Sequence, residues 1–184
     1  MRQIVNWLKN LVNILNFRST TVKTQTEATR ITPEDIETYE QFLQKILQVT
    51  AESYGDAQVI YPLLAANTDK LNDIFAELLR DWATNTLAEA EADQVESIAY
   101  LMVIFSNRIS NFPLGSKASN MEIAIAGYEI ALTVYTKSAF PEKWAMTQNN
   151  LGIAYRNRIL GERAENIESA IKAYNQALQV YTKS

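Results

Sequence analysis

The sequence predicts an all-α protein built from antiparallel helix pairs that stack side by side. Helix breakers are scarce, because the 184 residues include only five glycines and four prolines. Apolar residues recur at the spacing of one helix face in the longer segments of the chain. The second half also repeats itself, since residues 120–138 match residues 166–184 at a distance of 46 residues. Together these observations favour helices over strands.

Composition excludes several kinds of chemistry. The chain has no cysteine and no histidine, which rules out disulfides, thiolate zinc sites, imidazole ligands and histidine-based catalysis. It has no glycine pattern of a nucleotide-binding loop, and no apolar run approaches the roughly 18 residues of a membrane-spanning helix. We therefore expect a non-enzymatic protein without a cofactor or a metal site. The lack of cysteine is compatible with a cytoplasmic location.

The charge of the chain is unevenly distributed. Residues 1–30 contain five basic residues and one acidic residue, a charge of +4, whereas residues 31–184 contain 12 basic and 20 acidic residues, a charge of −8. Binding to phosphate groups needs a basic surface. The acidic body therefore argues against nucleic acid as a partner.

Residues 1–31 are predicted to form an amphipathic helix, over residues 1–17, and a threonine-rich linker. Two interpretations of this helix stay open. It docks on the acidic body or caps the helix array, or residues 2–17 lie on an anionic membrane surface and the protein is a peripheral membrane adaptor. Co-sedimentation with liposomes distinguishes the two, if the full chain is compared with one that starts near Ile31.

An N-terminal helical region is predicted over residues 32–92. Its start signal is strong, because Thr32 suits the N-cap, Pro33 the first helical position and Asp35 the acidic position of a capping box. Gly55 is predicted to end this first helix. The residues expected on its buried face are Ile36, Tyr39, Leu43, Ile46 and Leu47.

Two further helices are expected before residue 92. In the short segment that follows Gly55, Pro62 permits either a kinked helix or a break. The next helix is predicted to begin at Thr68. Its expected buried residues are Leu71, Ile74, Phe75, Leu78, Leu79 and Trp82.

Residues 93–184 are predicted to form two similar helix pairs. The second helices match at 46 residues, and the pairs of identical residues include Ala124 and Ala170, Ile125 and Ile171, Tyr128 and Tyr174, Ala131 and Ala177, and Leu132 and Leu178. The first helices match at 50 residues, where Leu101, Phe105, Asn107, Arg108 and Ile109 correspond to Leu151, Tyr155, Asn157, Arg158 and Ile159. The longer spacing reflects a four-residue insertion before a shared Leu-Gly step. The repeated unit is therefore a helix pair.

The last pair carries a spaced set of small and aromatic residues, namely Leu151, Gly152 and Tyr155 on one helix and Ala170, Tyr174 and Ala177 on the next. This set resembles the signature of the tetratricopeptide repeat (TPR). The resemblance implies a short TPR-like α-solenoid with an N-terminal helical cap. We expect the small residues to let the helices approach while the tyrosine rings fill the remaining space.

Residues 113–184 are also similar to the long tandem repeats of bacterial proteins that often end in a caspase-like CHAT domain. That domain is absent from this sequence, so no proteolytic activity carries over. The resemblance implies a bacterial scaffold or adaptor that binds a protein or a peptide in a helical groove. An alternative is a truncated regulatory region of a caspase-like protease system.

The TPR resemblance also implies which residues line the groove. The candidates are Met146, Asn149, Ile153, Arg156 and Asn157. Their amide and guanidinium groups suit the backbone or a carboxylate of a peptide. A second interpretation stays open, in which this polar cluster holds neighbouring repeats together and Arg158 stabilises the end of the helix; the cluster consists of Asn149, Asn150, Arg156, Asn157 and Arg158.

Two other sets of residues are assigned structural roles. Tyr128, Tyr135, Tyr174 and Tyr181 recur at helical spacing beside apolar residues, which is typical of a packing stripe rather than of a platform for bases or sugars. The four carboxylates Glu89, Glu91, Asp93 and Glu96 are interpreted as a solvated helix boundary rather than as a metal or acid–base site.

The last predicted helix raises one further expectation. Ile171, Tyr174, Leu178 and Tyr181 correspond to residues that the following helix covers in the first pair. We expect them to lack that cover, which indicates either self-association through the C-terminal helix or a natural chain that is a truncated member of the family.

Overall fold

The structure, a computed structural model, describes residues 32–182, and the predicted helix over residues 1–17 and its linker lie outside this range. Within residues 32–182 there are seven α-helices, one 3-10 turn and no strand, which confirms the all-α prediction. The helices are α2 (Pro33–Glu52), α3 (Ala57–Ala65), α4 (Asp73–Glu89), α5 (Ala92–Asn111), α6 (Lys117–Val134), α7 (Pro141–Asn157) and α8 (Arg163–Tyr181).

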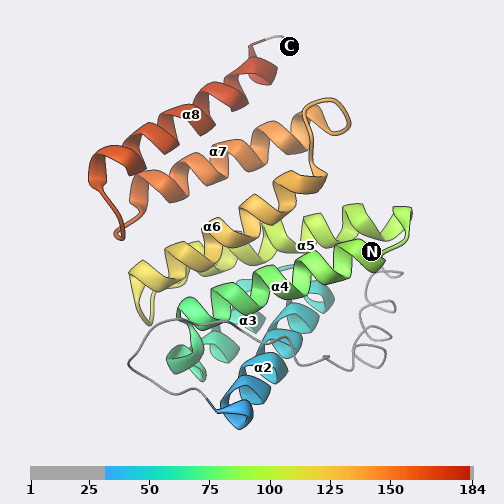
Figure 1. Cartoon of the computed structure of the whole chain (residues 1–184), viewed down its shortest axis with the longest axis vertical. Helices are drawn as coiled ribbons and strands as arrows, with labels where there is room; N and C mark the ends of the chain where they lie inside the picture. Colours follow the sequence, from blue (N-terminus) through green and yellow to red (C-terminus); the bar gives the residue numbers. More distant parts are fainter. Residues whose placement is uncertain (1–31, 183–184) are drawn as a thin grey trace.

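The helices are stacked along the long axis of the molecule, with α2 at one end and α8 at the other (Figure 1). From α4 to α8 each helix runs antiparallel to the next. α5 packs along α6, α7 packs along α8, and contacts between α6 and α7 join the two pairs. The two pairs that the internal repeat predicts are therefore present as packed neighbours.

Helix α6 lies at the centre of the packing, because α4, α5 and α7 all contact it. Its apolar residues point in several directions, and Ile123, Ile125 and Ile130 are all buried. At Gly127 the backbone of α5 comes close, since a Cβ there would lie 3.3 Å from the main-chain oxygen of Met102. A helix surrounded in this way needs apolar residues on several sides rather than on one stripe.

The start of α2 is the predicted capping box. The Asp35 amide donates to the Thr32 hydroxyl oxygen at 3.2 Å, and the Thr32 amide donates to the Asp35 carboxylate at 2.9 Å. The Thr32 amide and the Thr32 hydroxyl both donate to the Asp35 carboxylate, which lowers the pKa of Asp35. Of the predicted buried face, Leu43, Ile46 and Leu47 are buried, and Ile36 and Tyr39 are half-buried.

The turn after α2 ties this helix to α5. Gly55 has a φ of +79° and follows Tyr54, whose φ is also positive at 53°. The Gly55 carbonyl accepts a hydrogen bond from Nε of Arg108 on α5. Pro62 lies inside α3, so of the two alternatives for that segment a helix is found and a break is not.

The predicted start of the next helix at Thr68 is wrong. Thr68–Lys70 forms a 3-10 turn, and α4 begins five residues later at Asp73. Asn72 caps α4, because its side-chain oxygen accepts hydrogen bonds from the amides of Ile74 at 3.1 Å and Phe75 at 3.3 Å. The expected burial holds for Leu71, Phe75, Leu78, Leu79 and Trp82, while Ile74 is half-buried.

The two Leu-Gly loops show the repeat directly. The side-chain amide of Asn120 on α6 donates to the Leu114 carbonyl at 2.9 Å, and that of Asn166 on α8 donates to the Leu160 carbonyl at 2.8 Å. Both asparagines are buried, and the glycines after the two leucines have φ values of +74° and +77°. The same hydrogen bond therefore holds each loop to the second helix of its pair.

Candidate functional site

The five predicted binding residues lie on one side of α7 and largely face solvent. Met146, Ile153, Arg156 and Asn157 are exposed, and Asn149 is half-buried. Met146 and Ile153 keep 41% and 39% of their surface exposed. None of these five side chains hydrogen-bonds to another residue within the described range. We call this set the α7 face.

The interpretation that the polar cluster joins the repeats holds for two of its five residues, Asn150 and Arg158. Asn150 donates its side-chain amide to Oδ1 of Asn107 on α5 at 3.1 Å. The same oxygen accepts a hydrogen bond from the hydroxyl of Tyr128 on α6 at 2.7 Å. Asn107 therefore links three helices, and the packing role belongs to Asn150 rather than to Asn149.

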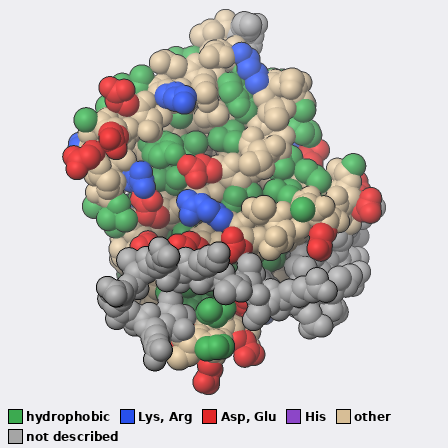
Figure 2. Space-filling model, in the orientation of Figure 1, with side chains coloured by type: hydrophobic (Ala, Val, Ile, Leu, Met, Phe, Trp, Pro, Cys, Tyr) green, Lys and Arg blue, Asp and Glu red, His purple; other side chains and the backbone are tan. Residues whose placement is uncertain are grey.

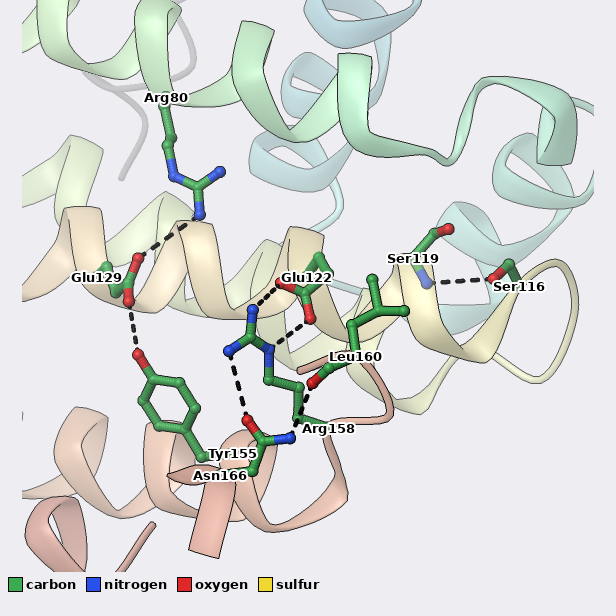
Figure 3. Close-up of polar contacts among 9 residues, drawn as sticks. All are labelled: Arg80, Ser116, Ser119, Glu122, Glu129, Tyr155, Arg158, Leu160 and Asn166. Carbon is green, nitrogen blue, oxygen red and sulfur yellow. Dashed lines mark hydrogen bonds and ion pairs between the residues drawn. The ribbon is translucent and has the colours of Figure 1, made fainter. Parts of the chain in front are cut away.

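Arg158, the residue that follows α7, pairs with a carboxylate on α6 (Figure 3). Its Nε and Nη2 donate to the two carboxylate oxygens of Glu122 at 2.7 and 2.8 Å. A third nitrogen, Nη1, lies 3.4 Å from Oδ1 of Asn166 on α8. The hydrogen bond with Glu122 raises the pKa of Arg158. This contact joins the end of α7 to α6.

A second carboxylate on α6 connects three helices. Oε1 of Glu129 accepts a hydrogen bond from the Tyr155 hydroxyl of α7 at 2.7 Å, and Oε2 lies 3.6 Å from Nη2 of Arg80 on α4 (Figure 3). Burial and the neighbouring Glu129 carboxylate raise the pKa of Tyr155. Sequence reasoning missed Glu122 and Glu129; their spacing of seven residues, which places them on one side of α6, was the available signal.

The tyrosine series packs as predicted over most of its length. Tyr128 and Tyr135 are buried, and Tyr174 is half-buried against Gly152. A Cβ at Gly152 would lie 2.7 Å from the Tyr174 ring, so the glycine is what lets the ring lie there. Tyr181, by contrast, is 49% exposed.

The predicted lack of cover on the last helix holds for three of its four residues, whereas Tyr174 is half-buried. Ile171, Leu178 and Tyr181 are 53%, 50% and 49% exposed, whereas Ile125 and Tyr135, the counterparts of Ile171 and Tyr181 on α6, are only 3% and 1% exposed. Figure 2 shows apolar side chains lying among charged ones over this part of the molecule. α8 therefore presents an apolar face to solvent.

The four carboxylates between α4 and α5 have separate environments. Glu91 is the N-cap residue of α5, and Glu96 pairs with Lys143 of α7. Within residues 32–182 no three potential ligand side chains gather in a way that would hold a metal ion. A shallow pocket between α2 and α5 is lined by Tyr54, Tyr100 and Ile104 among others, and no carboxylate lines it.

None of the helices within residues 32–182 combines the length and the hydrophobicity that crossing a lipid bilayer requires. No protein-family model, no curated protein and no solved structure matches the chain.

Proposed function

We propose that the protein is a non-enzymatic protein-interaction module, a TPR-like scaffold or adaptor whose helix pairs form a short α-solenoid. The packing of α5 on α6 and of α7 on α8 supports this arrangement, as do the matching loops before the second helix of each pair. Repeat arrays of this kind offer extended surfaces to other proteins.

The α7 face is the observation that carries the proposal. Met146 and Ile153 present apolar surface, while the guanidinium of Arg156 and the amides of Asn149 and Asn157 have no partner among the described residues. Protein interfaces are enriched in methionine and arginine and combine apolar contact with a small number of hydrogen bonds. The α7 face has this composition, and the bound partner is a protein or a peptide that offers a carboxylate or backbone carbonyls to Arg156.

The test is affinity capture from a lysate of the cells that encode the protein, followed by binding measurements with the purified partner. Arg156→Glu and Asn149→Ala are the test variants, and Lys45→Glu, an exposed position on α2, is the matched charge-reversal control. Circular dichroism checks that each variant keeps its helices. We expect the α7 variants to weaken binding about tenfold or more, while the control binds as the unmodified chain does.

Two outcomes contradict the proposal. A partner that binds both α7 variants with unchanged affinity places the binding surface elsewhere. Failure to capture any partner that binds the purified chain in a defined ratio removes the proposal.

A further inference from the structure

Helix α7 packs on a surface that α5 and α6 form together. The contacts of α7 show which side chains this surface binds. The polar contacts are Lys143 with Glu96, Asn150 with Asn107, and Arg158 with Glu122. The apolar contacts include the ring of Phe140, whose centre lies 5.5 Å from that of Tyr135. This interface is thus a template for how a helix of the α7 type seats on a helix pair.

The same surface recurs one helix pair further on. Because α5 matches α7 at 50 residues and α6 matches α8 at 46 residues, residues of the template surface have counterparts on α7 and α8. The counterparts of Glu96, Val103, Asn107, Glu122, Ile125 and Tyr135 are Met146, Ile153, Asn157, Glu168, Ile171 and Tyr181. We call the second six residues the end face. All six are exposed, whereas the six template residues are buried or half-buried.

We infer that the end face binds an α-helix of another protein, and that this helix carries the side-chain pattern of α7. The inference rests on the proposed function and specifies its partner. Helix-in-groove recognition of this kind uses large apolar residues on one side of the bound helix. The exposed Ile153, Ile171 and Tyr181 supply the apolar surface that such a helix covers.

Two polar residues of the template are retained unchanged and set the chemistry of the partner. Asn107 and Asn157 correspond, as do Glu122 and Glu168. In the template Asn107 accepts a hydrogen bond from the side-chain amide of Asn150, and Glu122 accepts hydrogen bonds from the guanidinium of Arg158. Arg158 follows Asn150 by eight residues. The partner helix therefore carries an asparagine and, eight residues on, an arginine that pairs with Glu168. Glu168 has no ion pair within the described range.

One template residue differs and gives the end face its own preference. Glu96 pairs with Lys143, but its counterpart on the end face is Met146. A thioether offers no charge to a lysine and packs well with apolar groups. The partner helix is therefore apolar at the position that Lys143 holds in α7.

A second copy of this chain supplies such a helix poorly. Its own α7 is already packed on α5, α6 and α8, so its apolar side is not free to seat on another molecule. The geometry therefore argues against a dimer in which α7 of one copy binds the end face of the other.

The test uses the full chain and a synthetic peptide with the sequence of residues 139–160, labelled for fluorescence anisotropy. We expect saturable binding at one site. Glu168→Arg weakens it about tenfold, as the loss of a partly desolvated ion pair does. A peptide with Arg158→Glu recovers most of the affinity for that variant. Glu77→Arg, an exposed charge reversal on α4, leaves binding unchanged.

A second peptide separates the end face from the internal surface. A peptide with Lys143→Leu binds more tightly than the unmodified sequence if it seats against Met146, and less tightly if it displaces α7 from Glu96. Tighter binding supports the inference. Weaker binding of this peptide, equal binding by the Glu168→Arg chain, or a dimer that the peptide does not dissociate overturns it.

The outcome is distinguishable from that of the functional test. Asn149 and Arg156 enter only the capture experiment, and Glu168 enters only the peptide experiment. A captured partner that depends on Arg156, together with a peptide that does not bind, keeps the proposed function and removes this inference. The reverse result keeps helix binding at the end face, which includes Met146, Ile153 and Asn157, and removes Asn149 and Arg156 from the binding surface.

Discussion

The guanidinium of Arg158 binds both carboxylate oxygens of Glu122 across the boundary between the two helix pairs. The two side chains are only 30% and 15% exposed, so the pair is partly shielded from water. The equivalent carboxylate one repeat later, Glu168, is exposed and has no such partner. The chain therefore holds a paired and an unpaired form of the same site, and each serves as the control for the other.

The first prediction uses this control. Glu122→Ala lowers the free energy of unfolding by about 1–2 kcal/mol, because it leaves a partly buried guanidinium without its charged partner. Glu168→Ala changes it by less than about 0.5 kcal/mol, as is usual for an exposed residue. Urea unfolding followed by circular dichroism measures both. Equal losses in the two variants contradict the assignment of Glu122 as an inter-pair contact.

The second prediction concerns the asparagine that links three helices. Asn107→Ala leaves the buried Tyr128 hydroxyl and the Asn150 amide without their common acceptor, which costs about 1–3 kcal/mol of stability. The matched substitution is Asn157→Ala, at an exposed position with no internal partner. It is expected to be nearly neutral in the same unfolding assay. A neutral Asn107→Ala shows that the three-helix contact does not stabilise the fold.

The third prediction tests the close approach of α7 and α8. Gly152→Ala places a methyl group 2.7 Å from the Tyr174 ring and destabilises the protein by about 1–3 kcal/mol through overpacking. Tyr174→Ala relieves the clash, so the double variant loses less than the sum of the two single losses. Denaturant midpoints of the four chains give this coupling. Strict additivity argues against contact between the two residues.

The fourth prediction is a dependence on pH. Burial raises the pKa of Tyr128 from its ordinary value of 10.0 to about 12. The unfolded chain loses this proton first, so the stabilising contribution is complete below 10.0 and is lost as the pH rises towards about 12. Tyr128→Phe removes the titrating group as well as the hydrogen bond to Asn107.

The measurement compares unfolding of the two chains as the pH rises. At about pH 8 the Phe variant is less stable than the unmodified chain, and towards about pH 12 the two free energies of unfolding converge. A constant difference over this range contradicts the assigned titration of Tyr128.

Local features of the fold followed readily from sequence. The Thr32–Asp35 capping box, the glycine after α2 and the exposed apolar face of α8 depend on residue type and on spacing along one helix. The start of α4 did not follow, because Thr68 and Asn72 are both good N-caps and four residues apart. Leu71 is buried in the core, and the next residue, Asn72, caps α4.

Contacts between distant helices were not predictable in the same way. The packing of α4 on α6 and the pairing of Arg80 with Glu129 depend on how helices far apart in sequence are arranged in space. The roles of Asn149 and Asn150 depend on the rotation of α7 about its axis, since one residue turns the side chain by about 100°. Helical periodicity located the outward side of α7 but did not show which asparagine reaches Asn107.

The central position of α6 has a consequence for how the molecule opens. Three helices must separate before the backbone amides of α6 meet solvent, whereas α8 is held chiefly by α7. Hydrogen exchange is therefore expected to be slower in α6 than in α8, where fraying of the terminal helix precedes cooperative unfolding. A ligand that binds α8 is therefore expected to slow the amide hydrogen exchange of that helix first.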